Sequence, residues 1–124
     1  MRRVDDLMHG ADALPLVSEA TPMGEALLTM SARGFGIIAV AAADGTLAGI
    51  VTDGDLRRNL ADLLTHSAGA IATRNPVTVP PEMLAAQALA LMNARKISVL
   101  LVADAQMRPV GILHIHDCLR AGVA

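Results

Sequence analysis

The sequence predicts a mixed α/β (α+β) fold made of two pseudo-symmetric repeats, each with the element order β-α-β-β-α, packed sheet to sheet. Three observations lead to this prediction. The two halves of the chain align with one another, and each half alternates short apolar stretches with amphipathic ones. A repeat of about 60 residues is also marginal by itself. Two related halves that pack together can share a core, and we expect a cleft between them.

A constant spacing relates the two halves. The stretch "ALLTMSARGFGIIAV" (26–40) aligns with "ALALMNARKISVLLV" (88–102), and "LAGIVTDGDLRRNL" (47–60) aligns with "PVGILHIHDCLRAG" (109–122). The same offset of 62 residues separates three matched pairs: Gly49 and Gly111, Met30 and Met92, Asp55 and Asp117. A shared offset across several elements indicates an internal duplication.

The sequence pattern of the first half predicts two helices and three strands. Apolar residues at helical spacing indicate a helix over 22–33, which Thr21 caps, Pro22 opens and Gly34 ends. "PLV" is a short strand, and 36–40 and 47–51 are strands joined by an Asp-Gly turn. A second helix is expected from near Asp53 to about Leu64.

The second half repeats this order. We expect a strand at 77–79, a helix at 82–94, strands at 98–102 and 109–113, and a closing helix from about residue 115. The predicted domains are a first repeat with its N-terminal lead-in at 1–64, a linker at 65–75 and a second repeat at 76–124.

Composition excludes several classes of protein. The net charge is −2 and Phe35 is the only aromatic residue, which disfavours nucleic-acid and anionic-membrane partners. The longest apolar runs are far shorter than the roughly 18 residues of a membrane span, and the N-terminus does not resemble a signal peptide. Cys118 is the only cysteine, which suits a cytoplasmic protein. The positive mean hydropathy predicts self-association.

The stretch "GIVTDGDLRR" (49–58) marks a strand that runs into a helix. One interpretation is structural: Thr52 caps the helix and Asp55 reaches back to form a capping box. The other is a binding site, because a hydroxyl and free N–H groups can hold a phosphate while a carboxylate accepts hydrogen bonds from a ribose. Arg57 and Arg58 could offset phosphate charge, although arginines on a helix are commonly only solvated.

The arrangement "G-I-V-T-D-G-D" resembles the CBS-domain motif, and the tandem pair resembles a Bateman module. That resemblance implies a Thr52 contact to phosphate and an Asp55 contact to the ribose of an adenosine-type ligand. In the binding hypothesis, the base of the ligand lies against aliphatic strand residues such as Ile37 and Ile38. The full set of residues that we expect to bind ligand is Thr52, Asp53, Asp55, Arg58, Ile37, Ile38, His114 and Asp117.

The second copy departs from the motif, because "G-I-L-H-I-H-D" has His114 where threonine is expected. A neutral imidazole can still donate to phosphate, so this site is either altered in specificity or empty. His114 and His116 would share a face if the strand continued, and with Asp117 they suggest a metal site as a lesser alternative. A polar strand end is the plainer interpretation, and we expect no metal.

"TDGDLRR" (52–58), the tail "GILHIHDCLRAGVA" (111–124) and the lead-in "RRVDDLMHGADALPLV" resemble the C-terminal region of D-arabinose 5-phosphate isomerases of the KpsF/GutQ type. The resemblance implies a parent enzyme of Kdo and lipopolysaccharide synthesis whose chemistry lies in a separate sugar isomerase (SIS) domain. We expect this chain to lack that domain and to have no catalytic residues. His9 and His66 are expected to face solvent, and Cys118 to pack in the closing helix.

Two functions remain open on sequence grounds. The first is a regulatory module that binds a nucleotide such as AMP or ATP, or the sugar nucleotide CMP-Kdo, with no other cofactor. The second is a structural oligomerisation module with vestigial ligand sites. Both predict a homodimer or higher homo-oligomer through the CBS pairs, attached to an SIS domain in the parent protein.

Overall fold

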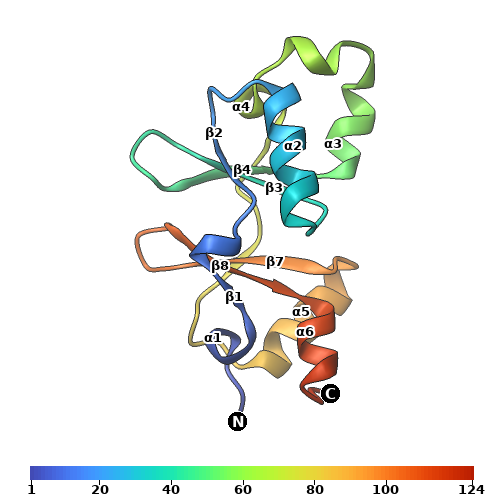
Figure 1. The fold of residues 1–124 in the computed structure, drawn as a ribbon. Coiled ribbons are helices and arrows are strands. Elements are labelled where there is room, and N and C mark those ends of the chain that lie inside the picture. Colours follow the sequence, from blue (N-terminus) through green and yellow to red (C-terminus); the bar gives the residue numbers. More distant parts are fainter. The chain divides into compact units, whose positions relative to one another are not determined.

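The computed structural model describes residues 1–124. The chain forms two compact units. The first-repeat unit is Pro15–Pro76, and the second-repeat unit combines Met1–Leu14 with Val77–Ala124. Each unit contains one four-stranded sheet with its own helices (Figure 1). The mixed α/β prediction and the repeated element order are confirmed.

In the first-repeat unit the strand order is β2-β3-β4-β5. Strand β2 is parallel to β3, and the other neighbours are antiparallel. The elements are β2 (Leu16–Ser18), α2 (Met23–Arg33), β3 (Ile38–Ala41), β4 (Leu47–Val51), α3 (Asp53–Arg58), the 3₁₀ helix η2 (Leu60–Thr65), α4 (Ala68–Ile71) and β5 (Thr73–Arg74).

The second-repeat unit has the matching strand order β6-β7-β8-β1. Its first pair is again parallel and the other two pairs are antiparallel. The elements are α1 (Val4–Leu7), β1 (His9–Gly10), the 3₁₀ helix η1 (Ala11–Ala13), β6 (Thr78–Val79), α5 (Ala85–Arg95), β7 (Val99–Ala103), β8 (Pro109–His114) and α6 (Ile115–Arg120).

The boundaries of the units differ from the predicted domains. Residues 1–14 pack with the second repeat and not with the first. Val4 is fully buried in the second-repeat core, and its N–H donates to the Met83 carbonyl at 2.8 Å. The predicted linker at 65–75 is also structured: it contains the helix α4, and β5 adds the fourth strand to the first-repeat sheet. Each repeat therefore takes its fourth strand from outside the segment that the alignment matches.

Two glycines mark where these fourth strands cross. A Cβ atom at Gly49 would lie 2.6 Å from the Thr73 carbonyl oxygen, and one at Gly111 would lie 2.7 Å from the His9 carbonyl oxygen. No side chain fits at those distances. Glycine at each position therefore permits the close approach of the fourth strand.

Helix ends in the first repeat differ from the sequence prediction in two places. The Thr21 hydroxyl contacts Ser18 Oγ at 2.9 Å and does not cap α2, which begins after Pro22. Helix α3 ends at Arg58, earlier than the predicted end near Leu64. The Asn59 side chain donates to the Asp55 carbonyl at 2.8 Å, and the chain continues as η2. Gly34 ends α2 in the left-handed conformation, with φ of 77°.

Each unit has its own aliphatic core between sheet and helices. The first-repeat core centres on Val17, Met23, Ala26, Ile38, Val40, Val51, Ala68 and Ile71. The second-repeat core centres on Val4, Val79, Ala88, Leu89, Met92, Leu100, Val102, Leu113 and Cys118. A membrane-spanning helix is not found among the elements, since none combines the necessary length with an apolar composition.

Candidate functional site

The first candidate site is the turn from β4 into α3, which carries the Thr52–Asp55 motif. The Asp55 carboxylate accepts four hydrogen bonds there. Its Oδ2 accepts from the Thr52 N–H at 2.9 Å and from the Thr52 hydroxyl at 3.1 Å. Its Oδ1 accepts from the Thr73 hydroxyl at 2.8 Å and from Arg58 Nη2 at 2.8 Å. All four lone-pair positions of this carboxylate are therefore used within the protein.

Asp55 is one of only two buried polar or charged residues, with 3% of its surface exposed. Burial by itself raises the pKa of the Asp55 carboxyl, but the hydrogen bonds from Thr52, Thr73 and Arg58 outweigh it, so the net pKa lies below the ordinary value of 3.8. The carboxylate is thus held ionised as the structural centre of the turn. The capping-box interpretation of Thr52 and Asp55 agrees with these contacts.

The other predicted residues of the first repeat lie in different surroundings. Arg58 is exposed, but its guanidinium is directed back to Asp55 and not away from the turn. Asp53 is exposed at the first position of α3, and Ile37 is half-buried just before β3. Ile38 is fully enclosed in the first-repeat core and is unavailable to a ligand. Only Ile37 therefore stays a candidate for apolar contact with a base.

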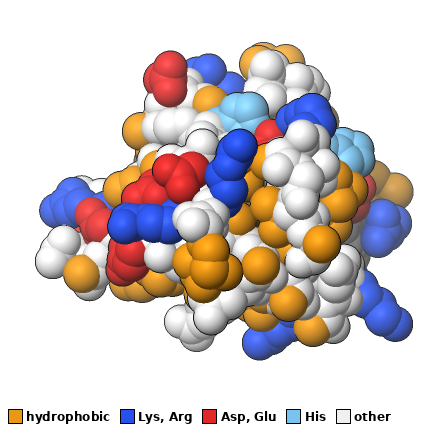
Figure 2. Space-filling view, turned by 90° about the horizontal axis from the view of Figure 1, so that it is seen from below, with side chains coloured by type: hydrophobic (Ala, Val, Ile, Leu, Met, Phe, Trp, Pro, Cys, Tyr) orange, Lys and Arg blue, Asp and Glu red, His pale blue; other side chains and the backbone are white.

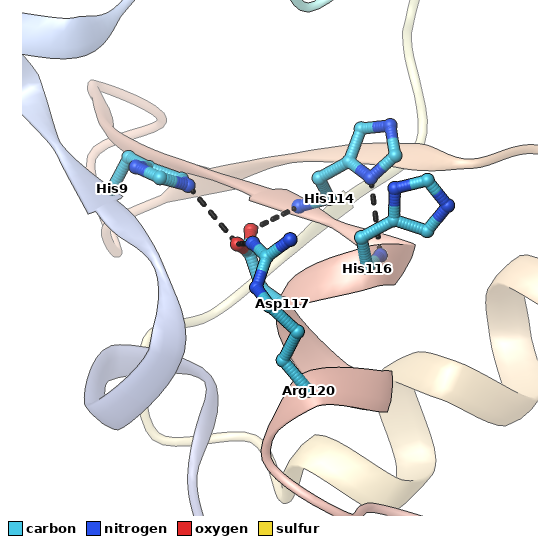
Figure 3. Close-up of polar contacts among 5 residues, drawn as sticks. All are labelled: His9, His114, His116, Asp117 and Arg120. Atoms are coloured by element: carbon cyan, nitrogen blue, oxygen red, sulfur yellow. Dashed lines mark hydrogen bonds and ion pairs between the residues drawn. The ribbon is translucent and has the colours of Figure 1, made fainter.

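The equivalent turn of the second repeat joins β8 to α6 and is built around Asp117 (Figure 3). The His114 N–H donates to Asp117 Oδ2 at 2.8 Å. Oδ1 contacts His9 Nε2 at 3.1 Å and accepts from Arg120 Nη2 at 2.7 Å. Asp117 is 8% exposed, whereas Arg120 is exposed like its counterpart Arg58.

His9 and Thr73 occupy the same position in the two units. Thr73 on β5 pairs with Ile50, and His9 on β1 pairs with Ile112, the residue 62 positions after Ile50. Each side chain reaches the buried carboxylate of its own unit. The second repeat therefore replaces two hydroxyls of the first, Thr52 and Thr73, with imidazoles.

His114 caps α6 through its ring. Its Nδ1 accepts from the His116 N–H at 3.0 Å, and the ring points away from the Asp117 carboxylate (Figure 3). Burial, reinforced by the charge of His116, lowers the pKa of His114 below its ordinary value of 6.5. Strand alternation does not bring His114 and His116 together, because the chain turns into α6 at Ile115. Their ring centroids nevertheless lie 4.6 Å apart.

The metal alternative has no matching geometry. No group of three or more histidine, cysteine, aspartate or glutamate side chains is arranged to hold a metal ion. Cys118 is buried in the second-repeat core, as expected, and burial followed by the charge of Asp117 raises the pKa of its thiol above 9.0. A raised thiol pKa disfavours the thiolate form that acts as a nucleophile.

Sequence reasoning missed two residues of these clusters, Thr73 and His9. Thr73 lies in the predicted linker, and His9 is 44% exposed in agreement with the prediction that it faces solvent, yet both side chains contact buried carboxylates. The internal alignment cannot reveal them, since Thr73 follows the first repeat and His9 precedes the second. The paired glycines at 49 and 111 were the available signal that a further strand crosses each sheet.

The fold and both turns match the CBS domain family, whose family model covers residues 4–62 and 68–124. The chain belongs to this family and is a tandem CBS pair. Among curated proteins it is 45% identical to the arabinose 5-phosphate isomerase KdsD of Pseudomonas aeruginosa, over 98% of this chain and 38% of that protein. It is 38% identical to KdsD of Escherichia coli K12, again over 98% of this chain and 38% of that protein. The chain thus spans well under half the length of these relatives.

Solved structures show the same fold. The complex of CBSX2 with AMP superposes with a TM-score of 0.85 at 26% identity, covering 98% of this chain and 96% of that one. The CBS pair of MJ0100, solved with 5′-methylthioadenosine and S-adenosyl-L-methionine, gives a TM-score of 0.84 at 23% identity, covering 98% and 96% of the two chains. The predicted resemblance to a CBS pair related to arabinose 5-phosphate isomerases is confirmed.

Proposed function

We propose that this CBS pair is a regulatory module that binds a nucleotide or sugar nucleotide at the turns that begin α3 and α6. The observation that carries the proposal is one polar arrangement repeated in both units: a buried carboxylate that accepts from the backbone N–H of the residue three positions earlier. The AMP bound to CBSX2, a protein of the same fold, supports an adenosine-type ligand.

The ligand has to compete for Asp55, because its four acceptor positions are filled. A ribose hydroxyl would displace Arg58 most readily, since 66% of the Arg58 side chain is exposed and exposed ion pairs contribute little free energy. Thr73 and the Thr52 N–H would keep the carboxylate in place. The released Arg58 would then be free to approach a phosphate at Thr52, which gives the arginine the role expected from the sequence.

The parent protein in this proposal is a cytoplasmic arabinose 5-phosphate isomerase of Kdo and lipopolysaccharide synthesis, with an SIS domain that performs the chemistry. Similarity to KdsD over the CBS region supports this assignment. A ligand would alter the isomerase only by as much as its affinity differs between two states of the parent. CMP-Kdo is the candidate feedback ligand, and AMP and ATP are the generic ones.

Calorimetric titration of the chain with AMP, ATP, CMP and CMP-Kdo tests the proposal. We expect saturable binding of at least one of them. Thr52→Val should weaken that binding about tenfold or more, because it removes the hydroxyl proposed to contact phosphate. Thr73→Val is the matched control, since it also removes one hydroxyl bond to Asp55 but lies outside the helix start. Equal losses in both variants would show that Thr52 acts only through the structure of the turn.

A second candidate function is oligomerisation, which exposed leucines favour. Leu28 on α2 and Leu60 and Leu64 on η2 are 72%, 71% and 71% exposed. Hydrophobic side chains also reach the surface among charged ones on the face in Figure 2. Light scattering after size exclusion separates the two functions: a stable oligomer that responds to no nucleotide would favour a scaffold with vestigial sites.

A further inference from the structure

We propose that the second repeat contains a proton-sensitive helix cap: His114 holds the start of α6 only as a neutral imidazole, so mild acid loosens this turn while the matching turn of the first repeat stays closed. This inference is independent of the proposed nucleotide function, because it concerns the protein without ligand. It makes the two units of the pair unequal in their response to pH.

The cap depends on which ring nitrogen carries the proton. His114 Nδ1 accepts from the His116 N–H at 3.0 Å, so in the neutral ring the proton must lie on Nε2. A second proton can add only at Nδ1. It would turn the acceptor into a donor that faces another donor, and it would place a positive charge at the positive end of a helix.

The groups around His114 come from two elements. His116, Asp117 and Arg120 lie on α6, and His9 lies on β1. Arg120 and His9 already contact Oδ1 of the one carboxylate, while Oδ2 accepts from the His114 backbone. The charge of Asp117 favours a protonated His114 ring, but burial and the charge of His116 oppose it more strongly, and Arg120 and His9 add further repulsion.

The direction of the pH effect follows from these contacts. Burial and the neighbouring His116 lower the pKa of His114 below 6.5 in the folded protein. The unfolded chain then binds this proton before the folded chain does. Stability from the cap is fully present above the unfolded value and is lost as the pH falls through the lowered folded pKa.

The first repeat provides the internal comparison. In the first repeat, Thr52 is the residue equivalent to His114, and Thr73 is the residue equivalent to His9. The threonine hydroxyls bind no proton in this pH range. Each turn has a buried aspartate, Asp55 or Asp117, that is paired with an arginine three residues later. A difference in acid response between the turns is therefore attributable to the imidazoles.

Nuclear magnetic resonance on the whole chain without nucleotide tests the cap directly. Long-range proton–nitrogen spectra at pH 8 should show His114 with its proton on Nε2. Between pH 7.5 and pH 5.5 the protection factor of the His116 amide, corrected for intrinsic exchange, should fall about fivefold, the amount expected for loss of a cap. The amide of Asp55, which the Thr52 side chain caps in the first repeat, should keep its protection. A proton on Nδ1, or equal losses at both amides, would overturn the proposal.

Three variants assign the response to one imidazole. His114→Thr installs the residue that the first repeat uses and should remove most of the acid-induced loss at α6. His66→Gln, which removes the histidine paired with Asp62 in the first-repeat unit, should leave that loss unchanged. His9→Thr should also leave most of it. Loss of the acid response in His9→Thr but not in His114→Thr would overturn the proposal and assign the proton to β1.

Discussion

Asp55 determines the structure of its turn, whatever it binds. Its carboxylate is buried and accepts from a backbone amide, two hydroxyls and a guanidinium. Removing the charge leaves several donors without partners in a buried place, which costs far more than an exposed ion pair contributes. The residue that the family motif associates with ligand is therefore also a residue that the fold requires.

Asp55→Asn is expected to lower the free energy of unfolding by about 2–4 kcal/mol, because the amide cannot accept at both ends. Urea denaturation at pH 7 measures this loss. Asp53→Asn is the matched control: Asp53 is exposed in the same helix turn and should change stability by less than about 0.5 kcal/mol. Similar effects of the two substitutions would contradict the structural role of Asp55.

The pH dependence of the free energy of unfolding also reports the structural role of the ionised Asp55 carboxylate. The pKa of Asp55 is lowered in the folded state, so the folded chain releases this proton more readily than the unfolded chain. The stability that Asp55 contributes is present above its ordinary value of 3.8 and is lost as the pH falls through the lowered folded value. Asp55→Asn should therefore flatten the acid limb of the stability profile below about pH 4.

At the scale of elements, the sequence predicts which helices and strands exist, and their order, better than it predicts the residues at which they begin and end. The 3.6-residue period of apolar residues predicts α2 and α5. Helix α5 begins at Ala85, three residues later than expected. It does not predict β1 and β5, which have two residues each and no periodic signal. The contacts of Thr73 and His9 with the buried carboxylates are therefore not predicted either, because these residues lie on the two short edge strands. Their place in the sheets depends on pairing with β4 and β8, which is long-range.

The end of α5 offers a test at this scale. Lys96 lies where Gly34 lies in the first repeat and adopts a left-handed φ of 55°. Lys96→Gly should raise the free energy of unfolding by about 0.5–1 kcal/mol, because glycine relieves that strain at some cost in entropy. Ala94→Gly, in the same helix, should instead lower it by about 1 kcal/mol. A destabilised Lys96→Gly protein would show that the lysine side chain is needed at the helix end.

For the whole molecule, the duplication is visible in sequence but the exchange of chain segments is not. The repeat alignment predicts two related units, and the structure assigns residues 1–14 to the second. Val4 is fully buried there, where it packs in the core that contains Met92 and Leu113. The lead-in therefore belongs to the repeat that lies farther along the chain.

Val4→Ala tests this assignment. It should destabilise the second-repeat unit by about 2 kcal/mol through lost burial and a residual cavity. Hydrogen exchange should quicken at amides of α5 and β8 more than at those of α2 and β4. Faster exchange confined to the first-repeat unit would contradict the assignment of the N-terminal segment.

The regulatory role is tested most directly by amide chemical-shift mapping of the whole chain as AMP is added. The account predicts saturable shifts concentrated at 52–55 and at Ile37, with or without a second set at 114–117. An absence of shifts at both turns, for AMP and for CMP-Kdo alike, would contradict it and leave the pair as a scaffold.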